Sequence, residues 1–261
     1  MPLDIHERLF YNMVILKVLT KRGAYQMFYL SRNDIEQIAE RTIAQYKTSF
    51  VPEHHLCYNV DPSELAMLLG FRIAYVNITK DGSILGQTSC GCAWTPIVGP
   101  NGEDYLFYLD GKTILVEERL LRDSKSIGRK NFTIAHELAH QIINREYHNM
   151  YGPQNRIFCD YRRSVKSHKK ITDWYEWQAD ALAAAILLPK DAVQDAMFMF
   201  GLGDKMKVLS KKYSENKYNC FCDMAEFFQV SKTALAYRME QLGLLERNYL
   251  IQEAQQRKGV A

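Results

Sequence analysis

Apolar residues recur every three to four positions in several stretches of the chain, which is the spacing of an amphipathic helix. Asp61 followed by Pro62 is a typical helix start, and Pro189 is a typical helix end. An apolar stretch at 9–19 is too short and too polar to span a membrane, so it predicts a further amphipathic helix. The main predicted helices cover residues 35–44, 61–70, 131–143 and 174–188.

Between the second and the third of these helices the pattern changes to the spacing of strands. Asp110-Gly111 separates two apolar runs and predicts a hairpin that joins them. The segment around Pro96 and Gly99 predicts a loop. Together the elements predict an α+β fold, in which a small antiparallel or mixed sheet packs on helices. The predicted strands cover residues 71–76, 105–109 and 112–116.

The C-terminal part of the chain has an all-helical pattern, and residues 223–245 within it predict a helix-turn-helix module. Ser231 is a typical N-cap of its second helix, and Gly243 is a typical end. Lys232 and Arg238 on that helix are candidate contacts to nucleic acid or a partner, although nearby acidic residues weaken that interpretation. We therefore expect two regions: 1–190 with the sheet, and 191–261 with the module.

The composition is ordinary for a globular protein: 261 residues, 47% hydrophobic and 24% charged, with a net charge of +3. This charge is too small to indicate nucleic acid or an anionic membrane as a partner. Without a recognisable signal peptide, we expect a cytoplasmic protein that does not bind a membrane. The six cysteines include the pairs Cys90/Cys92 and Cys220/Cys222, which lack the usual C-x-x-C spacing of structural zinc and are expected to be reduced thiols.

The third predicted helix contains the motif His136-Glu137-Leu138-Ala139-His140. Two residues four positions apart differ by about 40° around a helix, so both imidazoles leave the same face and can bind one metal. Imidazole suits zinc, and Glu137 beside the pair can take a proton from an attacking water. The apolar spacing of the helix predicts that the histidines lie at the edge of its buried side. In the alternative interpretation, the pattern is accidental and the histidines are solvated or core residues.

A catalytic zinc needs three protein ligands and one open position, which directs attention to carboxylates further along the chain. Glu176 is the candidate third ligand, because an unpaired carboxylate buried in an apolar helix would cost several kcal/mol. Asp180 follows one turn later on the same face. It is expected to accept a hydrogen bond from the remaining ring nitrogen of His136 or His140. The alternative places both carboxylates on a solvated face.

These motifs resemble those of the ImmA/IrrE family of bacterial metallopeptidases, best over residues 65–189. The residues concerned are the motif at 136–140, then Glu176-Trp177-Gln178-Ala179-Asp180 and Leu187-Leu188-Pro189. The resemblance implies a minimal gluzincin-type fold, in which the two motif histidines and Glu176 bind one zinc ion per chain and Glu137 is the general base. Members act on transcriptional repressors, often of mobile elements or stress regulons. The resemblance therefore implies a zinc-dependent endopeptidase with a repressor as its protein partner.

The connector between the motif and Glu176 includes a basic run, residues 161–170, that has no counterpart in the family pattern. Such a run is usually a solvated loop, and alternatively it lines the substrate cleft. The connector also supplies candidate groups for stabilising an oxyanion, among which the sequence does not choose: Tyr147, Tyr151, Tyr161 and His168. Another function stays open at this point, that of a DNA-binding or partner-binding regulator whose metal site is vestigial or structural.

Overall fold

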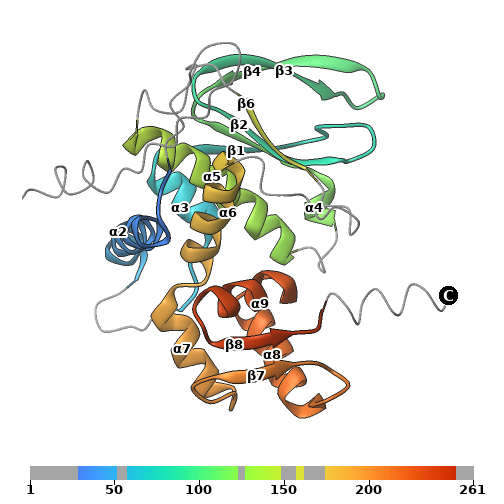
Figure 1. Ribbon diagram of the computed structural model, residues 1–261. Helices are drawn as coiled ribbons and strands as arrows, with labels where there is room; N and C mark the ends of the chain where they lie inside the picture. Colours follow the sequence, from blue (N-terminus) through green and yellow to red (C-terminus); the bar gives the residue numbers. More distant parts are fainter. Residues whose placement is uncertain (1–28, 52–57, 123–126, 148–156, 162–173, 251–261) are drawn as a thin grey trace, which may run out of the picture.

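The computed structural model describes residues 29–51, 58–122, 127–147, 157–161 and 174–250, which form an α+β fold (Figure 1). The predicted N-terminal amphipathic helix lies outside these residues. None of the described helices is both long and apolar enough to cross a membrane. The helices are α2 (Arg32–Phe50), α3 (Pro62–Leu68), α4 (Arg119–Arg122), α5 (Ile127–Glu146), α6 (Trp174–Leu187), α7 (Lys190–Met199), α8 (Glu215–Phe227) and α9 (Lys232–Gln241). The strands are β1 (Arg72–Val76), β2 (Ile84–Ser89), β3 (Cys92–Val98), β4 (Asp104–Asp110), β5 (Thr113–Glu117), β6 (Ile157–Tyr161), β7 (Met206–Leu209) and β8 (Leu245–Asn248).

The main sheet is mixed and has four strands in the order β1-β5-β2-β6. β5 pairs in parallel with β1 and antiparallel with β2, and β2 pairs antiparallel with β6. Every residue of β5 is buried, as its continuous apolar run leads one to expect of a central strand. β6 lies at the edge and comes from the connector between the motif and Glu176, where the sequence pattern predicted no strand.

The predicted hairpin at Asp110-Gly111 is wrong, because the two strands that flank this turn do not pair with each other. β4 pairs with β3 in a separate two-stranded sheet, whereas β5 enters the main sheet. Gly111 has a φ of 75°, which lets the chain turn sharply from one sheet to the other. Pro96 lies in β3 opposite Leu106 rather than in a loop. Proline is tolerated there because a strand of a two-stranded sheet pairs along one edge only.

The helices begin and end largely where short-range chemistry predicts. The Asp61 side chain accepts hydrogen bonds from two backbone amides of the first turn of α3, which starts as predicted. α2 begins earlier than its apolar spacing suggests, because Ser31 caps it and forms a reciprocal capping box with Asp34. α6 ends just before Pro189, also as predicted.

The prediction of an all-helical C-terminal part is wrong, because this part also contains two strands. β7 precedes α8 in the chain, β8 follows α9, and the two strands pair in parallel. Each strand has four residues, too few for a strand periodicity to stand out from the helical pattern around it. The local helix signals in this part are confirmed. Ser231 caps α9 by accepting a hydrogen bond from the Ala234 backbone amide, and Gly243 follows its end with a φ of 72°.

One cluster of buried apolar side chains extends from α2 through α5 and α6 to α9 and β8. Within it α5 packs against the sheet on one side and against α6 on another (Figure 1). As a result His136, Glu137 and His140 are all at most 1% exposed, so the prediction that the histidines lie at the edge of the buried side is wrong. Periodicity identified one apolar face of α5, whereas the folded chain also covers the face that carries the motif.

Candidate metal centre

Three side chains from two neighbouring helices bring their ligand atoms together. His136 Nε2 on α5 is 3.2 Å from His140 Nε2. Glu176 on α6 places Oε2 at 3.1 Å from His136 Nε2 and Oε1 at 3.4 Å from His140 Nε2. Within the described part of the chain, this is the one cluster of three or more His, Cys, Asp or Glu side chains spaced closely enough to hold a metal ion.

The spacing of these atoms fits a tetrahedral metal site. Zinc binds imidazole nitrogen and carboxylate oxygen at about 2.0–2.1 Å, so two ligands at a tetrahedral angle lie about 3.3 Å apart. The two imidazole nitrogens are 3.2 Å apart, close to this value, and the Glu176 carboxylate brings Oε2 to 3.1 Å from one nitrogen and Oε1 to 3.4 Å from the other. Two imidazoles and one carboxylate also match the ligand types of zinc and similar divalent transition metals. The donor set and its geometry therefore fit a bound metal.

The ionisation states of the cluster suit a cation as well. Burial raises the pKa of the Glu176 carboxyl, but hydrogen bonds with His136 and His140 outweigh this effect and hold the pKa well below its usual range. Burial lowers the pKa of His140. At neutral pH the cluster thus offers a carboxylate and a neutral imidazole, as metal binding requires.

Glu176 is less buried than its apolar helix predicts, because its side chain is 35% exposed. The side chains of His136 and His140 are only 2% and 0% exposed. α6 therefore covers the histidines while the carboxylate stands at the surface of the molecule. The cluster opens to solvent on the Glu176 side.

Asp180 lies one turn after Glu176 on α6, and its Oδ1 is 3.0 Å from His136 Nδ1. With a bound metal in place of the proton that His136 Nε2 shares with Glu176, His136 would keep its proton on Nδ1 and donate it to Asp180. His140 is held differently. Its ring stacks on Phe158 of β6, with centroids 4.1 Å apart, and within the described residues its Nδ1 has no hydrogen-bond partner. The contact of Phe158 with His140 was not predicted, because Phe158 lies in a strand that the sequence pattern does not indicate.

The candidate oxyanion groups are only partly described. Tyr147 is half-buried, and burial together with the nearby Glu146 carboxylate raises its pKa to about 12. Its hydroxyl therefore stays neutral well above physiological pH. Tyr161 is the last residue of β6, but its side chain, like Tyr151, His168 and most of the basic run, lies outside the described parts. An oxyanion role for any of these residues stays a prediction.

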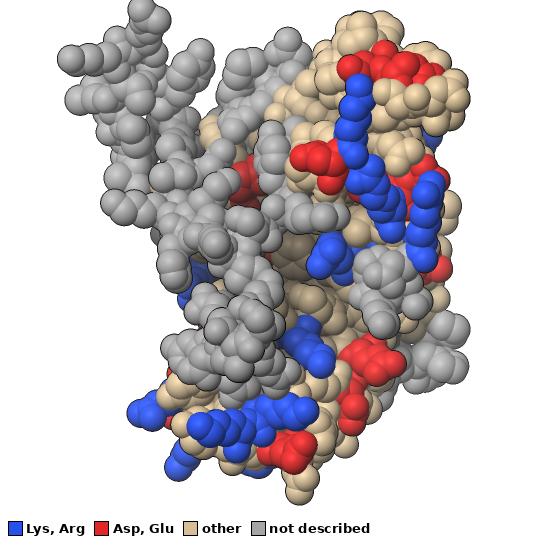
Figure 2. Space-filling model, turned by 90° about the vertical axis from the view of Figure 1, so that its right-hand side faces the viewer, with Lys and Arg blue, Asp and Glu red and all other residues tan. Residues whose placement is uncertain are grey.

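Arg238 is 2% exposed and connects three elements. Its Nε donates to the Leu188 carbonyl at 2.9 Å, and its guanidinium forms a two-pronged ion pair with Glu36 of α2, at 2.5 and 2.8 Å. This burial argues against the predicted contact between Arg238 and nucleic acid or a partner. Lys232 is exposed and lies over the Tyr218 ring, 5.6 Å from its centroid. On the face in Figure 2, basic and acidic side chains are interleaved rather than separated.

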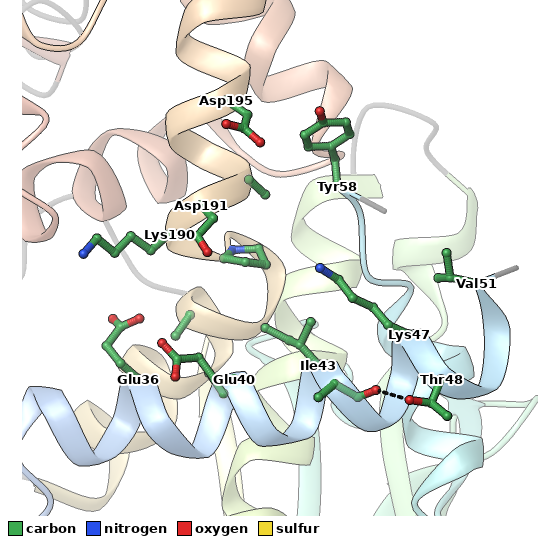
Figure 3. A pocket seen from close by; sticks show the side chains of 15 residues that line it. Glu36, Glu40, Ile43, Lys47, Thr48, Val51, Tyr58, Lys190, Asp191 and Asp195 are labelled. Atoms are coloured by element: carbon green, nitrogen blue, oxygen red, sulfur yellow. Dashed lines mark hydrogen bonds between the residues drawn. The ribbon is translucent and has the colours of Figure 1, made fainter. Parts of the chain in front are cut away.

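The cavities beside α6 and its continuation into α7 include the following two. One, of about 470 Å³, lies between α5, α6 and α9, and Asp180, Trp177 and Tyr237 are among its lining residues. The other, of about 440 Å³, lies between α2 and α7, where Glu40 and Asp191 project from opposite walls (Figure 3). The metal cluster contributes no residue to this second cavity. The three residues of the cluster do not line the first cavity either, but Asp180, which contacts His136, is part of its wall.

Comparison with known protein families gives one match. The model of the IrrE N-terminal-like domain, named Peptidase M78, matches residues 106–240, slightly more than half of the chain. The matched part contains α5 and α6 with all the side chains of the cluster, and it continues into α9. No curated protein matches the sequence.

Proposed function

Because the chain belongs to the Peptidase M78 family, we propose that it is a zinc-dependent endopeptidase that cleaves a helix-turn-helix transcriptional repressor and so relieves repression. Membership confirms the resemblance to the ImmA/IrrE metallopeptidases and makes the chain a peptidase by family. The observation that carries the finer proposal is the convergence of His136, His140 and Glu176 beside the fully buried Glu137.

In this proposal His136, His140 and Glu176 hold one zinc ion per chain, and Asp180 orients the His136 ring. A bound zinc ion would supply a Lewis acid that polarises the scissile carbonyl and acidifies a water molecule at neutral pH. Glu137 accepts the proton of the attacking water and then delivers it to the leaving amine. Its complete burial keeps the carboxylate away from competing solvent and fixes its position on α5.

The surroundings of the cluster support a polypeptide as the substrate. The site opens on the Glu176 side, where an incoming chain meets the carboxylate at the surface. The 470 Å³ cavity beside Asp180 adds a lining of mixed character, with the aromatic Trp177 and Tyr237 next to Thr233 and Arg129. Such a lining can contact both the backbone and the apolar side chains of a peptide. We do not extend the proposal to DNA, because Arg238 is engaged within the chain.

The experiment compares the zinc-loaded full chain with its Glu137→Gln variant on two substrates. One is a proteome-derived peptide library, and the other is a purified helix-turn-helix repressor. New internal N-termini, identified by mass spectrometry, are expected with the parent chain and not with Glu137→Gln. Metal analysis should give close to one zinc per chain for both proteins.

Glu146→Gln is the matched control, because Glu146 lies on the same helix in an exposed ion pair with Arg41. It should cleave as the parent does. Absence of internal cleavage by the parent chain on both substrates would refute the endopeptidase proposal. Retained cleavage by Glu137→Gln, or loss of its metal, would instead refute the role of Glu137 as the base. Cleavage of library peptides but not of the repressor would overturn the proposed substrate alone.

A further inference from the structure

β2 approaches α5 at Gly86 more closely than a residue with a side chain would allow. A methyl group at Gly86 would lie 2.6 Å from Thr133 Cγ2 and 2.8 Å from both Cγ and Oε1 of Glu137. Ordinary contacts of this kind are 3.4–4 Å long, so its neighbours would have to move by more than half an ångström. Gly86 is not in the left-handed conformation, so glycine is required here for space and not for the backbone.

The strand cannot easily retreat from the helix. Gly86 pairs with Val116 of β5 on one side and with Asp160 of β6 on the other, so β2 has a partner on both edges here, although the register with β6 shifts between Ile84 and Gly86. Further along the strand, Gln141 of α5 donates from Nε2 to the Ser89 carbonyl at 2.8 Å. These contacts fix the distance between β2 and α5. A side chain at position 86 must therefore be accommodated by the helix residues.

Thr133, Glu137 and Gln141 follow one another at intervals of four residues, so they form one ridge of α5 along β2. All three are nearly fully buried, with exposures of 1%, 0% and 4%. Thr133 is β-branched and has few rotamers to escape into. The added methyl group would therefore displace the Glu137 side chain, which has more torsional freedom than Thr133.

We propose that Gly86 is a positioning residue for Glu137: its missing side chain provides the space in which the carboxylate stands beside the metal cluster. This inference rests on the proposed role of Glu137 as the base. Misplacement of a reacting group by about 1 Å can cost about 100-fold in rate. Gly86→Ala is therefore expected to lower kcat about 10- to 100-fold. KM and zinc affinity should stay near those of the parent, because the atoms nearest to the new methyl belong to Thr133 and Glu137 and not to the metal ligands.

Two further variants separate positioning from a general loss of stability. Gln87 lies next to Gly86 in β2, and its Oε1 accepts a hydrogen bond from Thr95 of β3 at 2.9 Å. Gln87→Ala should destabilise the same strand and leave kcat unchanged. Thr133→Ser removes the methyl that makes the shortest contact. The double variant Gly86→Ala/Thr133→Ser should regain much of the lost stability while kcat stays low.

A measurement that does not need cleavage tests the contact itself. In the Thr133→Ser background, Gly86→Ala should lower the urea midpoint of unfolding less when Glu137 is also alanine, because the clashing carboxylate side chain is then absent. Equal losses with and without Glu137→Ala would overturn the inference, even in an active enzyme. Parallel recovery of stability and kcat in the double variant would overturn it too. If the parent chain cleaves nothing, the proposed function fails, and this unfolding measurement still decides whether Gly86 positions Glu137.

Discussion

Replacing Arg238 with methionine should destabilise the protein, because this arginine holds α9 against the rest of the chain. Its guanidinium forms a two-pronged ion pair with Glu36 of α2, and its Nε donates to the Leu188 carbonyl at the end of α6. The Arg238 side chain is 2% exposed, whereas that of Glu36 is 30% exposed. Methionine keeps most of the side-chain volume, so the loss comes mainly from the polar contacts.

The size of the effect follows from what each partner loses. Breaking a fully buried ion pair costs about 3–5 kcal/mol, because the remaining charge has no partner. Glu36 is partly exposed and regains water, which places its contribution near or below the lower end of that range. The Leu188 carbonyl loses a hydrogen bond from a charged donor, a contact worth about 1.5–3 kcal/mol. Since such contributions overlap, we expect Arg238→Met to lower the free energy of unfolding by about 2–4 kcal/mol.

Urea unfolding, followed by circular dichroism and tryptophan fluorescence, measures this loss. Lys232→Met serves as the matched control on the same helix, because Lys232 is exposed and loses a surface contact with the Tyr218 ring, so it should stay within about 1 kcal/mol of the parent. Arg238→Lys should fall between the two, since lysine keeps the charge but not the fork that contacts Glu36. A loss below about 1 kcal/mol for Arg238→Met would refute the reasoning and reopen Arg238 as a contact for an external partner.

Three further outcomes are expected. Asp180→Asn should weaken zinc affinity about 10- to 100-fold in competition with a chromophoric chelator, because Asp180 orients the His136 ring. At a free zinc concentration of about 100 times the Kd, bound zinc should add about 2.7 kcal/mol to the free energy of unfolding. Removing the zinc with a chelator should therefore lower the Tm measured by calorimetry by about 5–10 °C. Ser31→Ala should lower the free energy of unfolding by about 0.5–2 kcal/mol in urea, because it removes the cap of α2.

Each of these has its own check. Asp195→Asn replaces an exposed aspartate of α7 and should leave zinc affinity unchanged. An equal loss in the two aspartate variants would show that the Asp180 contact has no special role. A chelator that lowers the Tm of Glu176→Ala as much as that of the parent would place the stabilising metal elsewhere. Ser31→Gly should cost less than Ser31→Ala, and the reverse order would contradict the capping argument.

Features that depend on one or two turns of chain were predictable from the sequence. The Asp61 cap, the stop at Pro189 and the cap at Ser231 each involve atoms a few residues apart. The convergence of the two motif histidines follows in the same way, from the geometry of a single helix. Glu176 was predictable as their neighbour because a carboxylate is conspicuous in so apolar a helix, although its 35% exposure weakens the original argument from burial.

Features that depend on pairing between distant segments were not predictable. Asp110-Gly111 has the composition of a hairpin turn, yet the strands on its two sides do not pair with each other. β5 pairs with β1 and β2, and β4 pairs with β3. β7 and β8 are too short to show a period, and only their mutual pairing identifies them as strands. The contacts of Phe158 and Gly86 with α5 could not be predicted for the same reason. Each residue reaches α5 from a strand whose position the sequence pattern does not reveal.

α5 presents the two halves of the proposed chemistry to different neighbours. The ring nitrogens of its histidines meet Glu176 and Asp180 of α6, and the His140 ring also stacks on Phe158 of β6, whereas the ridge from Thr133 through Glu137 packs on β2. Substitutions of Glu176 or Asp180 in α6 should therefore act mainly on metal affinity, and a substitution of Gly86 in β2 mainly on the base. Because the histidines and the base belong to one rigid helix, their relative position changes only if a side chain moves. Close packing at Gly86 is one way in which the fold prevents such a movement, so a change in kcat without a change in zinc affinity is the expected signature of substitutions at Gly86.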